Sequence, residues 1–260
     1  MKLIISIYKQ AIVLLLLSLS TLTYAQEINI IDFEELKIQK KLIHKKHPEA
    51  ITHYKEIIQK ANKLLKHKVF SVVNKTGIPP SNSKHDYMSI GPYWWPNPNT
   101  KNGLPYVRRD GEVNPETQNN FTDVIEKRKF IYAVKTLCKA YYFSDDIKYA
   151  QKNITFINAW FLNEETKMNP NVNYGQYVPG KSKGRSFGII EFEGLKEVTK
   201  FLELVKYRGI LNKKTEVGMH NWFTKYSNWL KNSKLGKGAV VRKNNHGTHY
   251  DAQLLSILIF

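Results

Sequence analysis

The sequence has little cysteine, and Cys138 is the single example among 260 residues. A chain with one cysteine forms no internal disulfide, so its stability must come from packing. Cys138 follows Leu137 in a helical pattern, and we expect its thiol to be chemically inert. Hydrophobic residues make up 42% of the chain, which excludes a largely disordered polypeptide and provides material for a sizeable core.

Long apolar runs are scarce after the first 25 residues. The amino-terminal segment has the features of a secretory signal peptide: a positive charge at Lys2, an apolar stretch over 11–17 and a small-residue cleavage site ending at Ala25. The apolar stretch is too short to span a bilayer comfortably. We therefore expect residues 1–25 to be a signal peptide. The mature domain, residues 26–260, is expected in the periplasm or outside the cell, with no membrane anchor.

Acidic residues are also scarce. The 22 aspartates and glutamates are outnumbered by 40 lysines and arginines, which gives a formal charge of +18. Such a charge favours an anionic partner. For an exported protein, an acidic polysaccharide or an anionic cell surface fits this charge better than nucleic acid does, so we predict no nucleic-acid partner. Improved solubility is the alternative explanation that the charge leaves open.

Convincing alternation of polar and apolar residues, which is typical of strands, is missing as well. Helical spacing of apolar residues is common instead. Pro48 should divide the first helical stretch, because proline interrupts a helix interior. The pattern predicts an all-α fold of helical hairpins joined by long loops. The expected helical stretches are 33–68, 130–141, 146–161, 195–205, 222–230 and a last one that begins after Asn244.

Residues 74–120 lack helical spacing and are rich in glycine, proline, asparagine and aromatic residues. Loops of this length in compact domains are usually functional or disordered, and the tyrosine and tryptophan content argues against disorder. Polar and aromatic side chains gather in four loop or loop-edge segments, more densely than a scaffold needs. These segments are 84–96, 106–115, 168–176 and 244–251. We expect a functional site to be built from them.

The residue types in these segments suit the elimination reaction that cleaves a 4-linked uronate polymer. The carboxylate of the sugar must be neutralised so that the proton on C5 becomes acidic, and amide, imidazole or guanidinium donors can do this without a metal. A base must then take the C5 proton, and an acid must protonate the departing O4; histidine and tyrosine suit both tasks. The sequence supplies Asn173, Tyr174, Gln176, Asn245 and His246, together with Trp94 and Trp95 as stacking platforms for sugar rings.

The same residues also have purely structural interpretations. Trp94 and Trp95 could form a packed hydrophobic plug beneath a loop. Arg108 and Arg109 could form ordinary surface ion pairs with their acidic neighbours. The functional interpretation depends on four such segments occurring together in one basic, exported, helical chain.

The same residue types are also found in other kinds of site. His246 and His249 could bind a metal with Asp251 as a third ligand, but this spacing is loose, so we predict no metal and no cofactor. A glycoside hydrolase on a similar helical toroid would need a pair of carboxylates across the scissile bond, and no such pair is evident. A non-catalytic protein that binds acidic polysaccharide is the remaining alternative.

Several of these motifs together resemble the alginate lyase domain family. The resemblance extends from about residue 80 to the end of the sequence. It implies an incomplete (α/α) toroid whose concave face binds a uronate polymer, and therefore a polysaccharide lyase that acts by β-elimination. The motifs are KHDYMS at 84–89, PYWWP at 92–96, GLPY at 103–106, RRDGEVNPE at 108–116, MNPN at 168–171, NYGQ at 173–176 and KNNHGT at 243–248.

The resemblance also implies roles for individual residues. In the related lyases the histidine of Asn-Asn-His takes part in proton transfer or carboxylate neutralisation, and the preceding asparagine helps to neutralise the carboxylate. These roles fall to His246 and Asn245. The family's usual catalytic tyrosine lies later in the domain, in a part with no counterpart here, so the resemblance implies that the C-terminal part of the toroid is missing. Tyr174 is then the first tyrosine to test.

The sequence thus predicts a lyase that cleaves alginate or a related polyuronate, with an acidic polysaccharide as its partner. The expected catalytic residues are His246, Asn245 and Tyr174. The expected substrate-binding residues are Lys84, His85, Tyr87, Trp94, Trp95, Arg108, Arg109, Asn173, Gln176 and Tyr250.

Overall fold

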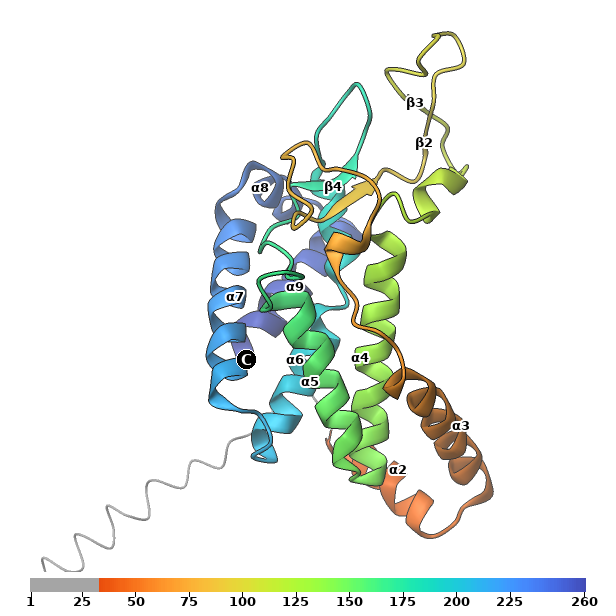
Figure 1. Cartoon of the computed structure of the whole chain (residues 1–260), viewed down its shortest axis with the longest axis vertical. Helices are drawn as coiled ribbons and strands as arrows, with labels where there is room; N and C mark the ends of the chain where they lie inside the picture. Colours follow the sequence, from red (N-terminus) through yellow and green to blue (C-terminus); the bar gives the residue numbers. More distant parts are fainter. Residues whose placement is uncertain (1–32) are drawn as a thin grey trace, which may run out of the picture.

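The computed structural model describes residues 33–260, and the predicted signal peptide lies outside them. Most of the described residues form α-helices (Figure 1). Among the described residues, no helix has both the length and the apolar character needed to cross a membrane. The helices are α2 (Phe33–His44), α3 (Pro48–Leu65), α4 (Val124–Ser144), α5 (Ile147–Phe161), α6 (Leu195–Tyr207), α7 (Lys213–Asn232), α8 (Lys234–Val240) and α9 (Asn245–Ile259).

Neighbouring helices pack as hairpins around a shared interior. Helix α4 contacts α3, α5 and α6, while α6 contacts α9, and α7 contacts both α8 and α9. This arrangement confirms the predicted all-α fold class and is that of an open (α/α) toroid. The predicted break at Pro48 is also confirmed. Pro48 begins α3, where a missing backbone N–H removes no intrahelical hydrogen bond.

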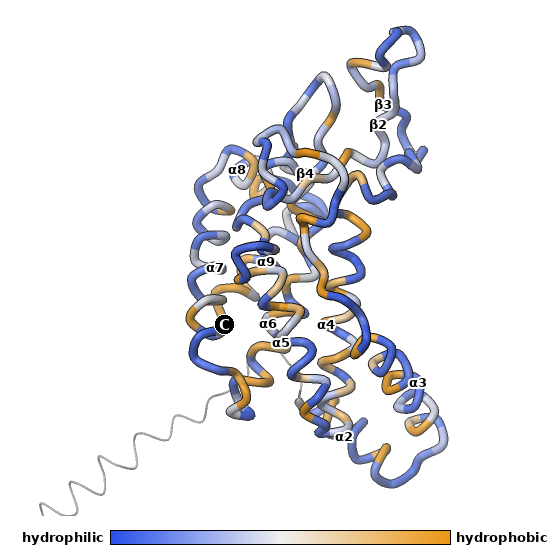
Figure 2. The backbone as a smooth tube through the Cα atoms, in the orientation of Figure 1, coloured by the Kyte–Doolittle hydropathy of each residue, from blue (hydrophilic) through white to orange (hydrophobic). Residues whose placement is uncertain are grey.

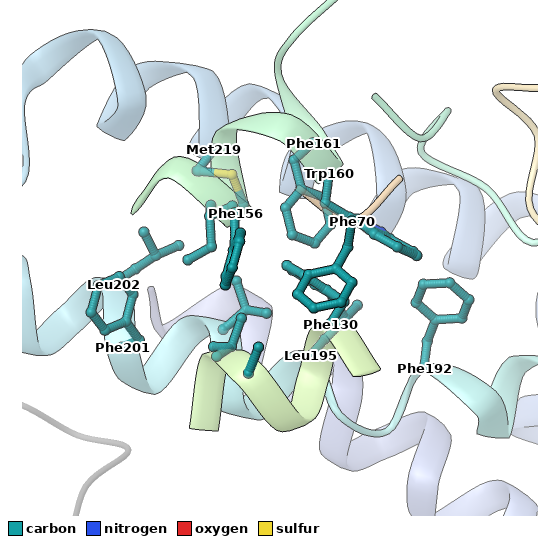
Figure 3. Close-up of a cluster of buried hydrophobic side chains, with 14 of the residues drawn as sticks. Phe70, Phe130, Phe156, Trp160, Phe161, Phe192, Leu195, Phe201, Leu202 and Met219 are labelled. Atoms are coloured by element: carbon teal, nitrogen blue, oxygen red, sulfur yellow. The ribbon is translucent and has the colours of Figure 1, made fainter. Parts of the chain in front are cut away.

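Aromatic side chains fill the interior between α4, α5 and the segment that follows α3 (Figure 3). The rings of Phe130 and Trp160 stack with their centroids 4.7 Å apart, and Phe70 meets Phe156 edge to face at 4.9 Å. Such pairs add about 0.5–1.5 kcal/mol each to the stabilisation that comes from area burial. Burial also raises the pKa of the Cys138 thiol to about 12, so little reactive thiolate exists at neutral pH.

Four short strands, which the sequence did not predict, lie in the loops. Strand β1 (Met88–Ile90) pairs in parallel with β4 (Tyr174–Tyr177), and β2 (Trp94–Trp95) pairs antiparallel with β3 (Val107–Arg108). The sequence shows no alternation at these positions, because segments of two to four residues are too short to show a period of two. Figure 1 shows β2, β3 and β4 at the same end of the helical body, and Figure 2 shows mostly hydrophilic residues in the loop between β2 and β3.

A buried ion pair fastens the long loop segment to the helical body. The Nζ atom of Lys75 lies 3.1 Å from a carboxylate oxygen of Asp123, and both side chains have 0% exposure. Lys75 also donates to the carbonyl oxygens of Val72 and Lys84, at 2.6 Å each. Asp123 holds Met88 twice, because its carboxylate accepts the Met88 N–H at 2.7 Å and its own N–H donates to the Met88 carbonyl at 2.9 Å. Strand β1 is therefore attached directly to the residue before α4.

Breaking this pair on one side should destabilise the protein strongly. Asp123→Ala would leave the Lys75 ammonium buried without its counter-charge, which typically lowers the free energy of unfolding by about 3–5 kcal/mol. The double variant Lys75→Met/Asp123→Leu should lose less than Asp123→Ala, because it leaves no buried charge behind. Urea unfolding of the three proteins gives these free energies. A cost below about 1 kcal/mol for Asp123→Ala, the range of exposed pairs, would contradict this account.

Candidate functional site

A cavity of about 380 Å³ lies where the loops carrying β2, β3 and β4 meet the start of α9. Its wall combines arginine, amide, imidazole and aromatic groups. Residues far apart in the sequence contribute to it, from the segment after β1 to the first turn of α9. The lining residues are Pro92, Tyr93, Trp94, Arg108, Gln176, Arg185, Phe187, Ile190 and His246.

The pairing of β2 with β3 places Trp94 and Arg108 together on the cavity wall. These two residues are direct partners in the antiparallel ladder, so their side chains lie on the same face. Their neighbours have other contacts: the Trp95 indole N–H donates to the Glu112 carbonyl at 3.0 Å, and the Arg109 guanidinium lies 4.9 Å from the Trp95 ring centroid. The register of this two-residue strand pair therefore places Trp94 in the cavity wall and leaves Trp95 outside it.

Arg185 lies between two aromatic rings in the cavity wall. Its guanidinium carbon is 5.7 Å from the Trp94 ring centroid and 4.5 Å from that of Phe187, and Arg242 approaches the Phe187 ring at 4.3 Å. Burial lowers the pKa of Arg185, and the positive charges of Arg108 and Arg242 lower it further. An arginine nevertheless stays protonated at the pH values proteins meet. Arg108 is already paired with Asp110 at 2.8 Å, whereas Arg185 has no carboxylate at ion-pair distance among the described residues, so Arg185 is the wall charge that an anion would neutralise.

Gln176 reaches the cavity from a strained position in β4. Strand β4 has an extra residue between its two register pairs with β1, which are Met88 with Tyr174 and Ile90 with Tyr177. Gln176 has a positive φ of 49°, which is uncommon for a residue with a side chain. Its N–H donates to the Ser89 hydroxyl at 2.7 Å, which fixes the bulge. Bulges of this kind often re-aim a side chain beside a functional site.

His246 lies in the first turn of α9, where the Asn244 side chain caps its backbone N–H at 3.1 Å. The imidazole ring meets Phe187 edge to face at 4.7 Å. Its Nδ1 atom is enclosed and has no hydrogen-bond partner among the described residues. Burial lowers the pKa of His246, and the charges of Arg242, His249 and Arg185 lower it further. The imidazole is therefore neutral at pH 7 and able to accept a proton.

The structure brings four of the predicted residues together in this cavity: Trp94, Arg108, Gln176 and His246. The other predicted residues of the same segments do not line it. Asn245 is exposed at the first position of α9, and Tyr174 is half-buried in β4. Trp95 and Arg109 stack on each other, and Asn173 accepts a hydrogen bond from the Trp229 indole at 2.8 Å.

Four further predicted residues from these segments also lie outside the cavity wall, and each has a hydrogen-bond partner within the protein. Tyr87 is fully buried and donates to Glu191 at 2.6 Å, and Tyr250 is enclosed, with its hydroxyl 3.2 Å from the Leu230 carbonyl. Lys84 donates to the Lys75 carbonyl at 3.0 Å, and a ring nitrogen of His85 lies 2.7 Å from the Lys167 carbonyl. Direct contact of Tyr87 or Tyr250 with a substrate would require the interior to open.

Sequence reasoning missed several residues of the cavity wall. Pro92 and Tyr93 belong to the PYWWP motif, but the sequence assigned them no role. No site residue was predicted in the stretch that contains Arg185, Phe187 and Ile190. The run of glycine and basic residues over 180–185 was the available signal for Arg185. Among the described residues, no group of three or more His, Cys, Asp or Glu side chains is placed to hold a metal. The Nδ1 atom of His249 lies 2.9 Å from a carboxylate oxygen of Glu193.

Comparisons with known proteins agree on one family. The family model described as "Alginate lyase" matches residues 71–260. A solved structure of an alginate lyase from Bacteroides ovatus is 40% identical, with a TM-score of 0.82, over 88% of this chain and 60% of that one. The chain thus spans about three-fifths of the length of that structure. No match is found among curated protein sequences. The chain belongs to the alginate lyase family, a family of polysaccharide lyases whose substrates are acidic.

The low pKa of His246 generates a prediction about its neighbours. Arg242→Gln removes a positive charge that opposes protonation of the imidazole, so the His246 pKa should rise toward its ordinary value. Titration of the ring C–H signals by NMR measures this directly. Lys243→Gln removes the same charge from an adjacent position that does not contribute to the shift, and should leave the pKa unchanged. Equal pKa values in wild type and Arg242→Gln would show that Arg242 does not act on the ring.

Proposed function

We propose that this chain binds and cleaves an acidic uronate polymer by β-elimination, with alginate as the first polymer to test. Family membership supports a lyase that acts on acidic polysaccharide. One observation carries the proposal: Arg108, Arg185, Gln176 and a neutral His246 line a single cavity. The predicted signal peptide, residues 1–25, would deliver the mature domain of residues 26–260 to the periplasm or the exterior, where such polymers occur.

Arg185 and Gln176 are the groups we assign to the sugar carboxylate. A guanidinium forms charge-assisted and often bidentate hydrogen bonds with a carboxylate, and an amide N–H donates to the same group. Neutralising the carboxylate makes the C5 proton more acidic, because the negative charge that develops on its removal is stabilised. Asn245, which is exposed and precedes His246 in the first turn of α9, would add a second amide donor once the polymer is bound. Trp94 would support a neighbouring sugar ring.

His246 is the group we assign to the C5 proton. Its neutral imidazole takes the proton, the electrons of the C5–H bond form the C4–C5 double bond, and the C4–O4 bond breaks. The departing O4 receives a proton from an acid. Tyr93, which lines the cavity, and Tyr174, which lies nearby in β4, are the tyrosines to test in that role. The products are a new reducing end and an unsaturated, ultraviolet-absorbing end.

The composition of the cavity wall disfavours a glycoside hydrolase. Hydrolases of that kind use two carboxylates that flank the scissile bond. The residues that line this cavity include no aspartate or glutamate. Acidic residues close in sequence to the lining residues are engaged: Asp110 pairs with Arg108 at 2.8 Å, and Glu191 and Glu193 with Tyr87 and His249. A non-catalytic protein that binds acidic polysaccharide differs from a lyase in a measurable way, because only the lyase forms unsaturated products.

Substitutions at the two central residues should slow cleavage strongly, for different reasons. His246→Ala removes the proton acceptor and should lower turnover by roughly 10²–10⁴-fold, with little effect on polymer binding. Arg185→Gln removes the main carboxylate donor and should lower turnover by about 10²–10³-fold while also weakening binding. Ultraviolet absorbance of the products reports cleavage, and affinity electrophoresis in alginate gels reports binding.

Three results would count against the lyase assignment. Saturated reducing ends would indicate a hydrolase, and binding without any product would indicate a binder. Full turnover by His246→Ala would show that another group takes the C5 proton. Unchanged thermal melting curves for both variants are needed to attribute a loss of activity to the site.

The neighbouring tryptophans provide an internal control for sugar stacking. Trp94→Ala should weaken polymer binding, because stacking of a ring on an aromatic face is lost from the cavity wall. Trp95→Ala should leave binding close to that of wild type, because its ring packs on Arg109 outside the cavity. Binding isotherms with alginate oligosaccharides test both. An equal loss in the two variants would mean that the effect comes from loop stability and not from contact with sugar.

A further inference from the structure

A second and larger cavity, of about 680 Å³, lies between α5, α7 and the loop that follows α5. It shares no lining residue with the cavity around His246. Figure 1 shows α5 and α7 in front of α6 and α9. No lining residue of this cavity comes from α6 or α9. We call it the lysine groove, because Lys167, Lys213, Lys214 and Lys225 are among the residues that line it.

Two of the four lysines in the lysine groove are paired with carboxylates, and two are not. Its one acidic lining residue, Glu164, pairs with Lys167, and Lys213 lies 3.1 Å from Glu216 on the same helix. Lys214 and Lys225 are exposed, and within the described part of the chain neither has a carboxylate at ion-pair distance. An anion that enters the groove would therefore meet two ammonium groups outside any close ion pair, of which Lys225 also attracts the Glu164 carboxylate from a longer distance.

The surface between the lysines suits a sugar chain. Leu162, Pro170 and Val217 give it an apolar floor, against which the C–H faces of a pyranose ring can pack. Gly218 belongs to this floor, and a Cβ atom there would come within 2.9 Å of the Leu162 side chain, so the glycine permits α7 to approach this closely. Asn221, exposed at the edge of the groove, offers an amide to sugar hydroxyl groups.

The loop wall of the groove is preformed. The Met168 N–H donates to the Trp160 carbonyl at 2.7 Å, and the Trp222 indole N–H donates to the Met168 carbonyl at 2.9 Å. The Asn169 N–H donates to the His85 carbonyl at 2.9 Å. These bonds tie the loop to α5, to α7 and to the segment before β1. Little conformational entropy would therefore be lost from the wall when a ligand binds.

We propose that the lysine groove binds a second stretch of the acidic polysaccharide, outside the site of cleavage. The class of ligand rests on the proposed function, whereas the groove itself rests on its own lysines and floor. A long polymer that occupies both cavities gains avidity, because binding at the second site becomes intramolecular. A short uronate oligosaccharide gains nothing from the groove when it occupies the cavity around His246. The groove should thus raise affinity for long chains selectively.

The test compares two double variants of equal charge. Lys214→Gln/Lys225→Gln alters the groove, and Lys55→Gln/Lys63→Gln removes two exposed charges from α3 as the matched control. Retardation in gels that contain long-chain alginate measures affinity, with dextran gels as the neutral reference. The groove variant should bind alginate about fivefold or more weakly than wild type, from the usual range for two exposed charge contacts. The control variant should bind as wild type does.

The same comparison in an Arg185→Gln background separates this proposal from the proposed function. If the groove variant, but not the control variant, still loses affinity for alginate in this background, the result supports binding at the lysine groove. This holds even if no unsaturated product is ever formed. Equal losses in the groove and control variants would show that only net charge matters and would overturn the proposal. No loss in either variant would overturn it as well. An equally large groove-specific loss toward polyphosphate would contradict the assignment to a polysaccharide.

Discussion

The buried pair of Lys75 and Asp123 connects the helical body to the loops that form the candidate site. Neither charge is exposed, so each depends on the other for compensation. Asp123 precedes α4 and also holds Met88 through two hydrogen bonds, which fixes β1 against the helices. Strand β1 pairs with β4, and the bulge in β4 turns Gln176 toward the cavity. The geometry of the cavity thus rests on a buried charge pair that does not itself line the cavity.

Electrostatics couples the two tasks that we assign to the cavity. Arg185, which would bind a carboxylate, also helps to keep His246 neutral, because its charge opposes protonation of the imidazole together with burial and the charge of Arg242. A carboxylate that binds beside Arg185 would cancel part of this positive field. The His246 pKa would then rise at the moment when a proton has to be accepted. In the proposed reaction, the substrate itself would therefore strengthen the base that attacks it.

The sequence predicted the helices well, because their apolar residues repeat at helical spacing over many turns, and because proline marks the start of α3. It also singled out Trp94, Arg108, Gln176 and His246, which the structure brings together. It missed Arg185, which lies in a short loop rich in glycine and lysine, where no regular spacing of apolar residues indicates which side chains are buried. Irregular loops do not reveal which side chains face inward. For this reason Tyr87 and Tyr250 looked like surface residues of a site, although both are enclosed.

The central claim is that the cavity around His246 receives a uronate residue with its carboxylate on Arg185 and Gln176. A crystal structure of the His246→Ala variant with a bound alginate tetrasaccharide tests this most directly, because the variant should bind the ligand without cleaving it. We expect one sugar carboxylate within hydrogen-bond distance of both Arg185 and Gln176, with C5 facing position 246. A well-ordered tetrasaccharide that leaves this cavity empty, or that directs its carboxylates away from Arg185, would contradict the account.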